Sequence, residues 1–200
     1  MRAKAGLLKK MPRAYSSETH AYAEIKRELK RRGFNTRNPN RDPHGEVYTQ
    51  HEAAGNEELK KGLQGGVPEN IVKLGGDKLW VIEAKRHPNQ LTKALNEAKD
   101  YAKSINDNSS QFQSVLVTGV AGSDEDGYKY TSAYLAHDGW KKITIEGRPL
   151  ARLLRKSECI AILNTKNPNI HQRELTTKEV VEPSALARSY PPVLVKTDPG

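Results

Sequence analysis

Cysteine, aromatic side chains and long apolar runs are all scarce in this sequence of 200 residues. Its single cysteine, Cys159, excludes an intramolecular disulfide and any metal site built from a cysteine cluster. No apolar run approaches the roughly 20 residues of a membrane-spanning helix, and the basic N-terminal stretch lacks the apolar segment of a secretory signal. We therefore expect a cytoplasmic protein that works in a reducing compartment.

The hydrophobic fraction of 36% is low for a globular chain, and charged residues make up 28%. A chain of this length suits one ordinary domain, but so small an apolar fraction can fill a core over only part of it. We expect that domain over residues 16–163, preceded by a basic flexible arm over 1–15. Five of the eleven prolines lie in residues 163–200, so we interpret 164–200 as a tail or a linker to a missing domain.

Positive charge is the first indication of a partner. The net charge is +9, with 33 Lys and Arg against 24 Asp and Glu. Residues 1–35 hold ten basic and three acidic side chains, a local net charge of +7. Basic chains often bind polyanions, so nucleic acid is a candidate partner. A solvated basic arm is the alternative that charge alone leaves open.

Hydrophobic periodicity and turn residues predict an α/β domain. Apolar residues at helical spacing predict a helix over 17–32, and a longer apolar stripe predicts a helix that Pro88 opens and that reaches Ile105. The other expected elements are strands at 46–49, 71–74, 79–85, 115–120, 128–137 and 142–145, and helices near 57–63 and 149–156. Gly75-Gly76-Asp77-Lys78 is the expected turn between the strands at 71–74 and 79–85.

Glu69, Glu83 and Lys85 are the main candidates for chemistry. Side chains alternate along a strand, so Glu83 and Lys85 share one face of the strand expected at 79–85. An acid and a lysine at the end of an apolar strand are costly to bury unless they pair or bind a ligand. Glu69 begins the neighbouring strand and can lie opposite, and two carboxylates with a lysine suit a Mg²⁺ ion and a water nucleophile. A surface strand with an ion pair is the alternative.

The order Glu69, thirteen residues, then Glu83-Ala84-Lys85 resembles the PD-(D/E)xK nuclease superfamily. The resemblance implies a restriction-endonuclease-like core, a central mixed β-sheet flanked by helices. It also implies that Glu69 and Glu83 bind metal together with the Ala84 carbonyl, and that Lys85 orients or activates the water. Glu69 stands where that family usually has Asp, and Asp77 is an alternative first acid.

Three further residues contribute to the resemblance. Glu18 lies on the apolar stripe of the first helix, where the nuclease family often places an acid; an interaction with the helix dipole is the alternative. The helix after the strand carries Glu97-Ala-Lys-Asp-Tyr101, similar to the Gln-x-x-x-Tyr pattern of RecB-like and type I restriction nucleases, with Glu replacing Gln. Core packing is the alternative for Tyr101. Residues 16–120 look like the N-terminal nuclease domain of type I restriction motor subunits, or of single-chain restriction-modification enzymes.

The resemblance implies a Mg²⁺-dependent DNA endonuclease domain of a bacterial restriction-modification system, in which Mn²⁺ can substitute. The implied partners are double-stranded DNA and further domains or subunits of a restriction-modification complex. The side chains expected to hold the DNA backbone are Lys26, Lys30, Arg31, Arg86 and His87. A catalytically silent nucleic-acid-binding module with the same fold is the alternative function.

Overall fold

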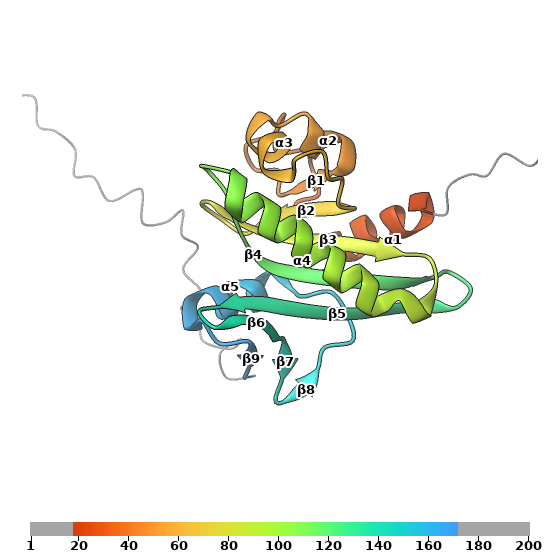
Figure 1. Cartoon of the computed structure of the whole chain (residues 1–200). Coiled ribbons are helices and arrows are strands. Elements are labelled where there is room, and N and C mark those ends of the chain that lie inside the picture. Colours follow the sequence, from red (N-terminus) through yellow and green to blue (C-terminus); the bar gives the residue numbers. More distant parts are fainter. Residues whose placement is uncertain (1–17, 172–200) are drawn as a thin grey trace, which may run out of the picture.

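A six-stranded mixed β-sheet with helices on both faces forms the body of the molecule (Figure 1). The structure, a computed structural model, describes residues 18–171, with side chains from residue 21 onward. In chain order the elements are α1 (Glu18–Arg31), β1 (Val47–Thr49), α2 (Gln50–Ala54), α3 (Glu57–Leu63), β2 (Asn70–Lys73), β3 (Lys78–Lys85), the 3-10 helix η1 (Pro88–Gln90), α4 (Leu91–Asn108), β4 (Gln113–Ser123), β5 (Gly127–Ala136), β6 (Gly139–Lys142), β7 (Thr144–Ile145), β8 (Arg148–Pro149), α5 (Lys156–Thr165) and β9 (Asn169–Ile170). The expected α/β fold is confirmed. None of the helices in this described part is long and apolar enough to cross a membrane.

β3 and β4 lie at the centre of the large sheet, whose order is β1-β2-β3-β4-β5-β6. They run parallel to each other, whereas the remaining neighbours in this sheet are antiparallel. The hairpin between β2 and β3 turns at Gly75 and Gly76, both at positive φ, as the sequence predicts. The strand expected at 115–120 lies within β4 and is buried along its whole length.

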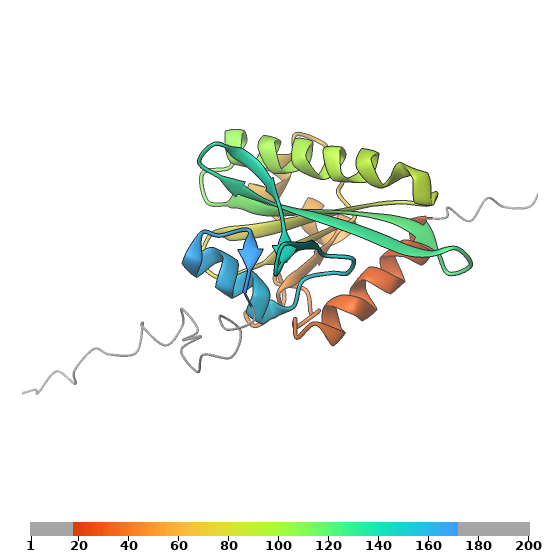
Figure 2. The same ribbon diagram turned by 90° about the horizontal axis from the view of Figure 1, so that it is seen from below.

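The alternation of side chains along β3 divides the core between the two faces of the sheet. Leu79 and Val81 pack with α3 and α4 on one face, and Trp80 and Ile82 pack with α1 and α5 on the other. Figure 2 shows α4 above the sheet and α1 and α5 below it. The predicted apolar stripe of α1, formed by Ala21, Ile25 and Leu29, is buried in the same cluster as Trp80 and Ile82. Apolar periodicity therefore determines which side of α1 is buried against the sheet.

α4 approaches β4 very closely at Gly119. A Cβ atom built on Gly119 would lie 2.5 Å from the backbone nitrogen of Leu95 and 2.9 Å from the Leu91 carbonyl oxygen. These are backbone atoms of a helix, so they cannot rotate away as the end of a flexible side chain can. The absence of a side chain at this position lets the N-terminal half of α4 rest directly on the sheet.

Replacing Gly119 with alanine is expected to lower the free energy of unfolding by about 1–3 kcal/mol, because the added methyl overpacks the contact. Gly55→Ala is the matched control, since a Cβ there meets its nearest atom at 3.5 Å and the backbone φ is −84°. Urea unfolding of both variants measures the difference. A midpoint for Gly119→Ala equal to that of the control would contradict the close contact.

The helix predicted over 149–156 is wrong. β8 occupies the start of that range, and α5 begins only after Arg155. The buried carboxylate of Glu158 accepts hydrogen bonds from the Arg155 N–H at 2.7 Å and from the Arg152 guanidinium at 2.6 and 2.8 Å. These contacts between a buried acid and the chain before the helix fix where α5 starts, and apolar periodicity does not reveal them.

The strand predicted over 142–145 is divided between two sheets. β6 ends at Lys142 in the large sheet, and Thr144 begins β7 in a small sheet of order β8-β7-β9. Ile143, between them, is buried, and its N–H donates to the Ser132 carbonyl at 2.9 Å. The chain turns out of one sheet and into the next at this buried residue.

Folded structure continues beyond residue 163, where the tail was expected to begin. β9 pairs in parallel with β7, and its residue Ile170 is 1% exposed. Residues 164–171 therefore belong to the folded part of the chain. The remainder of the predicted tail and the predicted basic arm lie outside the described residues.

Candidate active site

Glu69, Glu83 and Lys85 come together at one end of the large sheet, on the face that α4 covers. The β2–β3 register pairs Asn70 with Ile82, so the next position places Glu69 opposite Glu83. The Glu69 N–H donates to Glu83 Oε2 at 3.3 Å. Lys85 follows two residues later on the same face of the strand. The structure thus brings together the three residues that the sequence pattern selected.

The Lys85 ammonium contacts two carboxylates. Its Nζ lies 2.7 Å from Glu83 Oε1 and 2.6 Å from Glu97 Oε2. Glu97 belongs to α4, and Lys93 approaches its other oxygen at 3.9 Å. Lys85 therefore joins the end of β3 to α4. We call Glu69, Glu83, Lys85 and Glu97 the acid cluster.

Burial and ion pairing act in opposite directions on these groups. Burial opposes the charge of Lys85, but its hydrogen bonds to Glu83 and Glu97 outweigh that effect and raise its pKa above the ordinary lysine value. Burial raises the pKa of Glu83, although the Lys85 ammonium works against this rise. At neutral pH Lys85 is consequently a charged hydrogen-bond donor and not a base.

Glu69 is contacted by a residue that sequence reasoning missed. Glu69 is 4% exposed, and Gln50 Nε2 donates to its Oε2 at 3.3 Å and to the Val67 carbonyl at 3.4 Å. Gln50 begins α2, a five-residue helix too short for an amphipathic pattern. The pattern Thr49-x-x-Glu52 could have revealed the start of α2 at Gln50, because Thr49 and Glu52 form a reciprocal capping box with hydrogen bonds of 2.9 and 3.2 Å.

Tyr101 lies at the edge of the acid cluster. Burial raises the pKa of Tyr101, and the negative charges of Glu83 and Glu97 add to the rise. A Cβ atom on Gly66 would come within 2.7 Å of the Tyr101 ring, so the chain leading to β2 passes directly beside it. Tyr101 also packs against the apolar cluster beneath α4. Tyr101 therefore both packs against the core and lies beside the acid cluster, so its position agrees with both interpretations.

Glu69 and Glu83 suit a hard cation. Both carboxylates are buried, at 4% and 6% exposed, and they stand side by side with Ala84 next along β3. Among the residues that the structure describes, no group of three or more His, Cys, Asp or Glu side chains could hold a metal ion. Mg²⁺ is often held by one or two carboxylates and keeps several waters, whereas structural Zn²⁺ takes four protein ligands. The donor set therefore fits Mg²⁺ better than Zn²⁺.

Asp77, the alternative first acid, lies at the opposite end of β3. It belongs to the β2–β3 turn, its side chain is 56% exposed, and it pairs with the adjacent Lys78 at 3.1 Å. Six residues of strand, about 20 Å at the usual rise, separate it from Glu83. Asp77 is therefore not the partner of Glu83, and Glu69 is.

The predicted DNA-binding residues lie in two separate places. Arg86 and His87 follow β3 directly and are exposed beside the acid cluster. Lys26, Lys30 and Arg31 lie on α1, which packs on the other face of the sheet. Arg31 is already paired with an acid of its own helix at 2.8 Å. Because α1 packs on that other face, the structure does not bring these three residues to the acid cluster.

Glu18 is the first residue of α1, but its side chain lies outside the described residues. α1 covers the sheet face that carries Trp80 and Ile82, whereas Glu83 and Lys85 point to the opposite face. A catalytic role for Glu18 stays a prediction.

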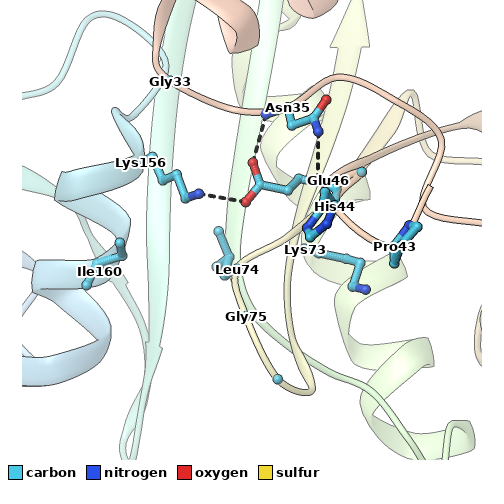
Figure 3. A pocket seen from close by; sticks show the side chains of 12 residues that line it. Gly33, Asn35, Pro43, His44, Glu46, Lys73, Leu74, Gly75, Lys156 and Ile160 are labelled. Carbon is cyan, nitrogen blue, oxygen red and sulfur yellow. Dashed lines mark hydrogen bonds and ion pairs between the residues drawn. The ribbon is translucent and has the colours of Figure 1, made fainter. Parts of the chain in front are cut away.

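A pocket of about 640 Å³ lies at the far end of the sheet, beside the β2–β3 turn (Figure 3). The acid in its lining is Glu46, whose carboxylate binds the Lys156 ammonium at 2.9 Å and the Asn35 N–H at 2.7 Å. This carboxylate already has two donors, and no second acid lines the pocket. The pocket therefore does not offer the paired carboxylates found at the acid cluster.

Comparison with known proteins identified no relative of this chain. No family model, curated protein or solved structure matches the chain. The sequence pattern and the geometry of the acid cluster are therefore the observations from which a function can be inferred.

Proposed function

We propose that this chain is a Mg²⁺-dependent DNA endonuclease domain of the PD-(D/E)xK kind, from a bacterial restriction-modification system. The observation that carries the proposal is the placement of Glu69 opposite Glu83, with Lys85 on the same face. Glu69 and Glu83 are fourteen positions apart in sequence. Their meeting, in a buried site beside a lysine, is the arrangement that the resemblance requires.

The sheet supports the same proposal. β1, β2 and β3 form an antiparallel meander, and α4 connects β3 to the parallel strand β4. The restriction-endonuclease-like core implied by the resemblance likewise has a central mixed sheet flanked by helices. Glu83 and Lys85 lie at the carboxyl end of β3, where α/β sheets commonly bind their ligands.

The residues of the acid cluster would divide the work of phosphodiester hydrolysis. Mg²⁺, when bound, stabilises charge on the phosphate and lowers the pKa of a water molecule. Glu69 and Glu83 would hold it through carboxylate oxygens, and Gln50 fixes the Glu69 side chain. Lys85, charged at neutral pH, would donate a hydrogen bond that orients the attacking water or a phosphate oxygen. Glu97 positions the Lys85 ammonium.

One observation favours the alternative, a catalytically silent nucleic-acid-binding module of the same fold. Lys85 already contacts Glu83 and Glu97, so the cluster partly balances its own charge without a metal ion. In a silent module this contact would be structural, and bound DNA would stay uncut with or without metal. The two functions therefore differ in their response to metal.

The test is nicking of supercoiled plasmid by the intact chain with Mg²⁺, with Mn²⁺ and with EDTA. We expect cleavage with either metal, no cleavage in EDTA, and retention of DNA binding in EDTA as measured by a gel-shift assay. Binding without cleavage in all three conditions would favour the silent module.

A further inference from the structure

A groove of about 440 Å³ runs along one flank of α4, over the edge of the large sheet. Leu95 and Lys99 of α4 form part of one wall, and Thr131 of β5 contributes to the floor. Trp140 and Lys142, two residues apart on β6, line the other side. Because side chains alternate along a strand, Trp140 and Lys142 share one face of β6. The volume lies within the range of sites for small ligands.

Helical spacing places this groove across α4 from the acid cluster. Leu95 and Lys99 are four residues apart, as are Glu97 and Tyr101, and the second pair is displaced from the first by two residues. Two residues correspond to about 200° around a helix, so the pairs lie on opposite flanks. A helix with its side chains is about 10 Å wide. At about 3.4 Å per nucleotide along a duplex strand, that width corresponds to about three nucleotides.

The chemistry of the groove suits an aromatic anion. No acidic residue lines it, and within the described part of the chain neither Lys99 nor Lys142 forms an ion pair. Trp140 packs against the apolar cluster beneath α4 yet is only partly buried, so part of its surface lines the groove. Trp80, the second tryptophan, is 0% exposed and donates its indole N–H to Thr118 at 2.9 Å.

We propose that this groove holds an unpaired nucleotide of the DNA strand that is cut, with its base stacked on Trp140 and adjacent phosphates bound by Lys99 and Lys142. The inference rests on the proposed nuclease function and specifies its substrate as DNA with a single-stranded or locally opened segment near the cut. Stacking tolerates any base because every base has a π-face, so the groove selects unpaired DNA and not a sequence.

Tryptophan fluorescence provides a test that does not depend on cleavage. With Trp80 buried, quenching by added DNA reports on Trp140. In EDTA, we expect a short single-stranded oligodeoxynucleotide to quench the emission, and the same strand annealed to its complement to quench it far less. Trp140→Ala should weaken single-strand binding about tenfold, and Trp140→Phe should restore most of it. Fluorescence anisotropy of a labelled strand measures the affinity of both variants.

The lysines provide a second, independent measurement. Lys99→Gln and Lys142→Gln should each reduce the slope of log affinity against log salt by about 0.7. Lys103→Gln, on the same helix but paired with Asp107 at 2.6 Å, is the matched control and should leave the slope unchanged. Equal quenching by duplex and single strand, no quenching, or wild-type affinity in Trp140→Ala would overturn the inference. Plasmid nicking is measured separately from single-strand binding. The groove proposal can therefore be refuted while the nuclease proposal is confirmed, and the nuclease proposal can be refuted while the groove proposal is confirmed.

Discussion

Replacing Glu83 with glutamine is expected to reduce Mg²⁺-dependent DNA cleavage by about a thousandfold. Glutamine keeps the shape of the side chain but loses the negative charge that would hold the metal. Metal ions supply several kcal/mol of transition-state stabilisation, and about 4 kcal/mol corresponds to three orders of magnitude in rate. Lys85 keeps its contact with Glu97 in this variant, so the connection between β3 and α4 persists. Initial rates of plasmid nicking at fixed Mg²⁺ measure the effect.

The same variant should lose the stabilisation that Mg²⁺ confers. A ligand that binds only the folded chain raises the melting temperature as its concentration rises. We expect Mg²⁺ to raise the Tm of the wild type and to leave that of Glu83→Gln nearly unchanged. Glu125→Gln, in the exposed turn between β4 and β5, is the control and should behave as the wild type. Wild-type cleavage by Glu83→Gln would exclude Glu83 as a metal ligand.

Replacing Lys85 with alanine is expected to reduce the cleavage rate by about a hundredfold to a thousandfold, even at saturating Mg²⁺. Removal of one preorganised donor at a site of developing charge typically has an effect of this size. Metal affinity should be unchanged or higher, because the Lys85 ammonium contacts Glu83 at 2.7 Å and competes with a cation for that carboxylate. Titration calorimetry with Mg²⁺ separates the two effects.

Lys93→Ala is the matched control for Lys85. Lys93 also approaches Glu97, at 3.9 Å, but its side chain is 61% exposed and it does not contact Glu83. The control should retain nearly the full rate, since exposed ion pairs of this kind contribute little. A variant at Lys85 that loses metal affinity together with cleavage would indicate a structural role for the lysine.

The sequence predicted the parts of the site that depend on periodicity. Alternation along 79–85 placed Glu83 and Lys85 on one face, and the glycine turn at 75–76 set a hairpin whose register brings Glu69 opposite Glu83. Helical spacing in α4 placed Glu97 and Tyr101 near them. Each of these inferences uses a local pattern whose geometric consequence is fixed by strand or helix geometry.

Other features depend on contacts between distant residues and could not be predicted in this way. Gln50 reaches Glu69 from a helix of only five residues, and the start of α5 is set by the buried Glu158. The choice between Glu69 and Asp77 required the strand register, because both acids are at plausible distances from Glu83 in sequence. The position of Lys26 and Lys30 across the sheet from the acid cluster follows from the packing of α1, which charge patterning does not report.

DNA hydrolysis by the acid cluster, with the help of Lys85, can be tested in one experiment. The most direct single measurement is the rate of plasmid cleavage by Lys85→Ala relative to the wild type, at saturating Mg²⁺ and equal DNA occupancy. We predict metal-dependent cleavage by the wild type and a loss of about a hundredfold or more in the variant, with DNA binding retained. Cleavage that proceeds in Lys85→Ala at the wild-type rate would contradict the assignment of this site.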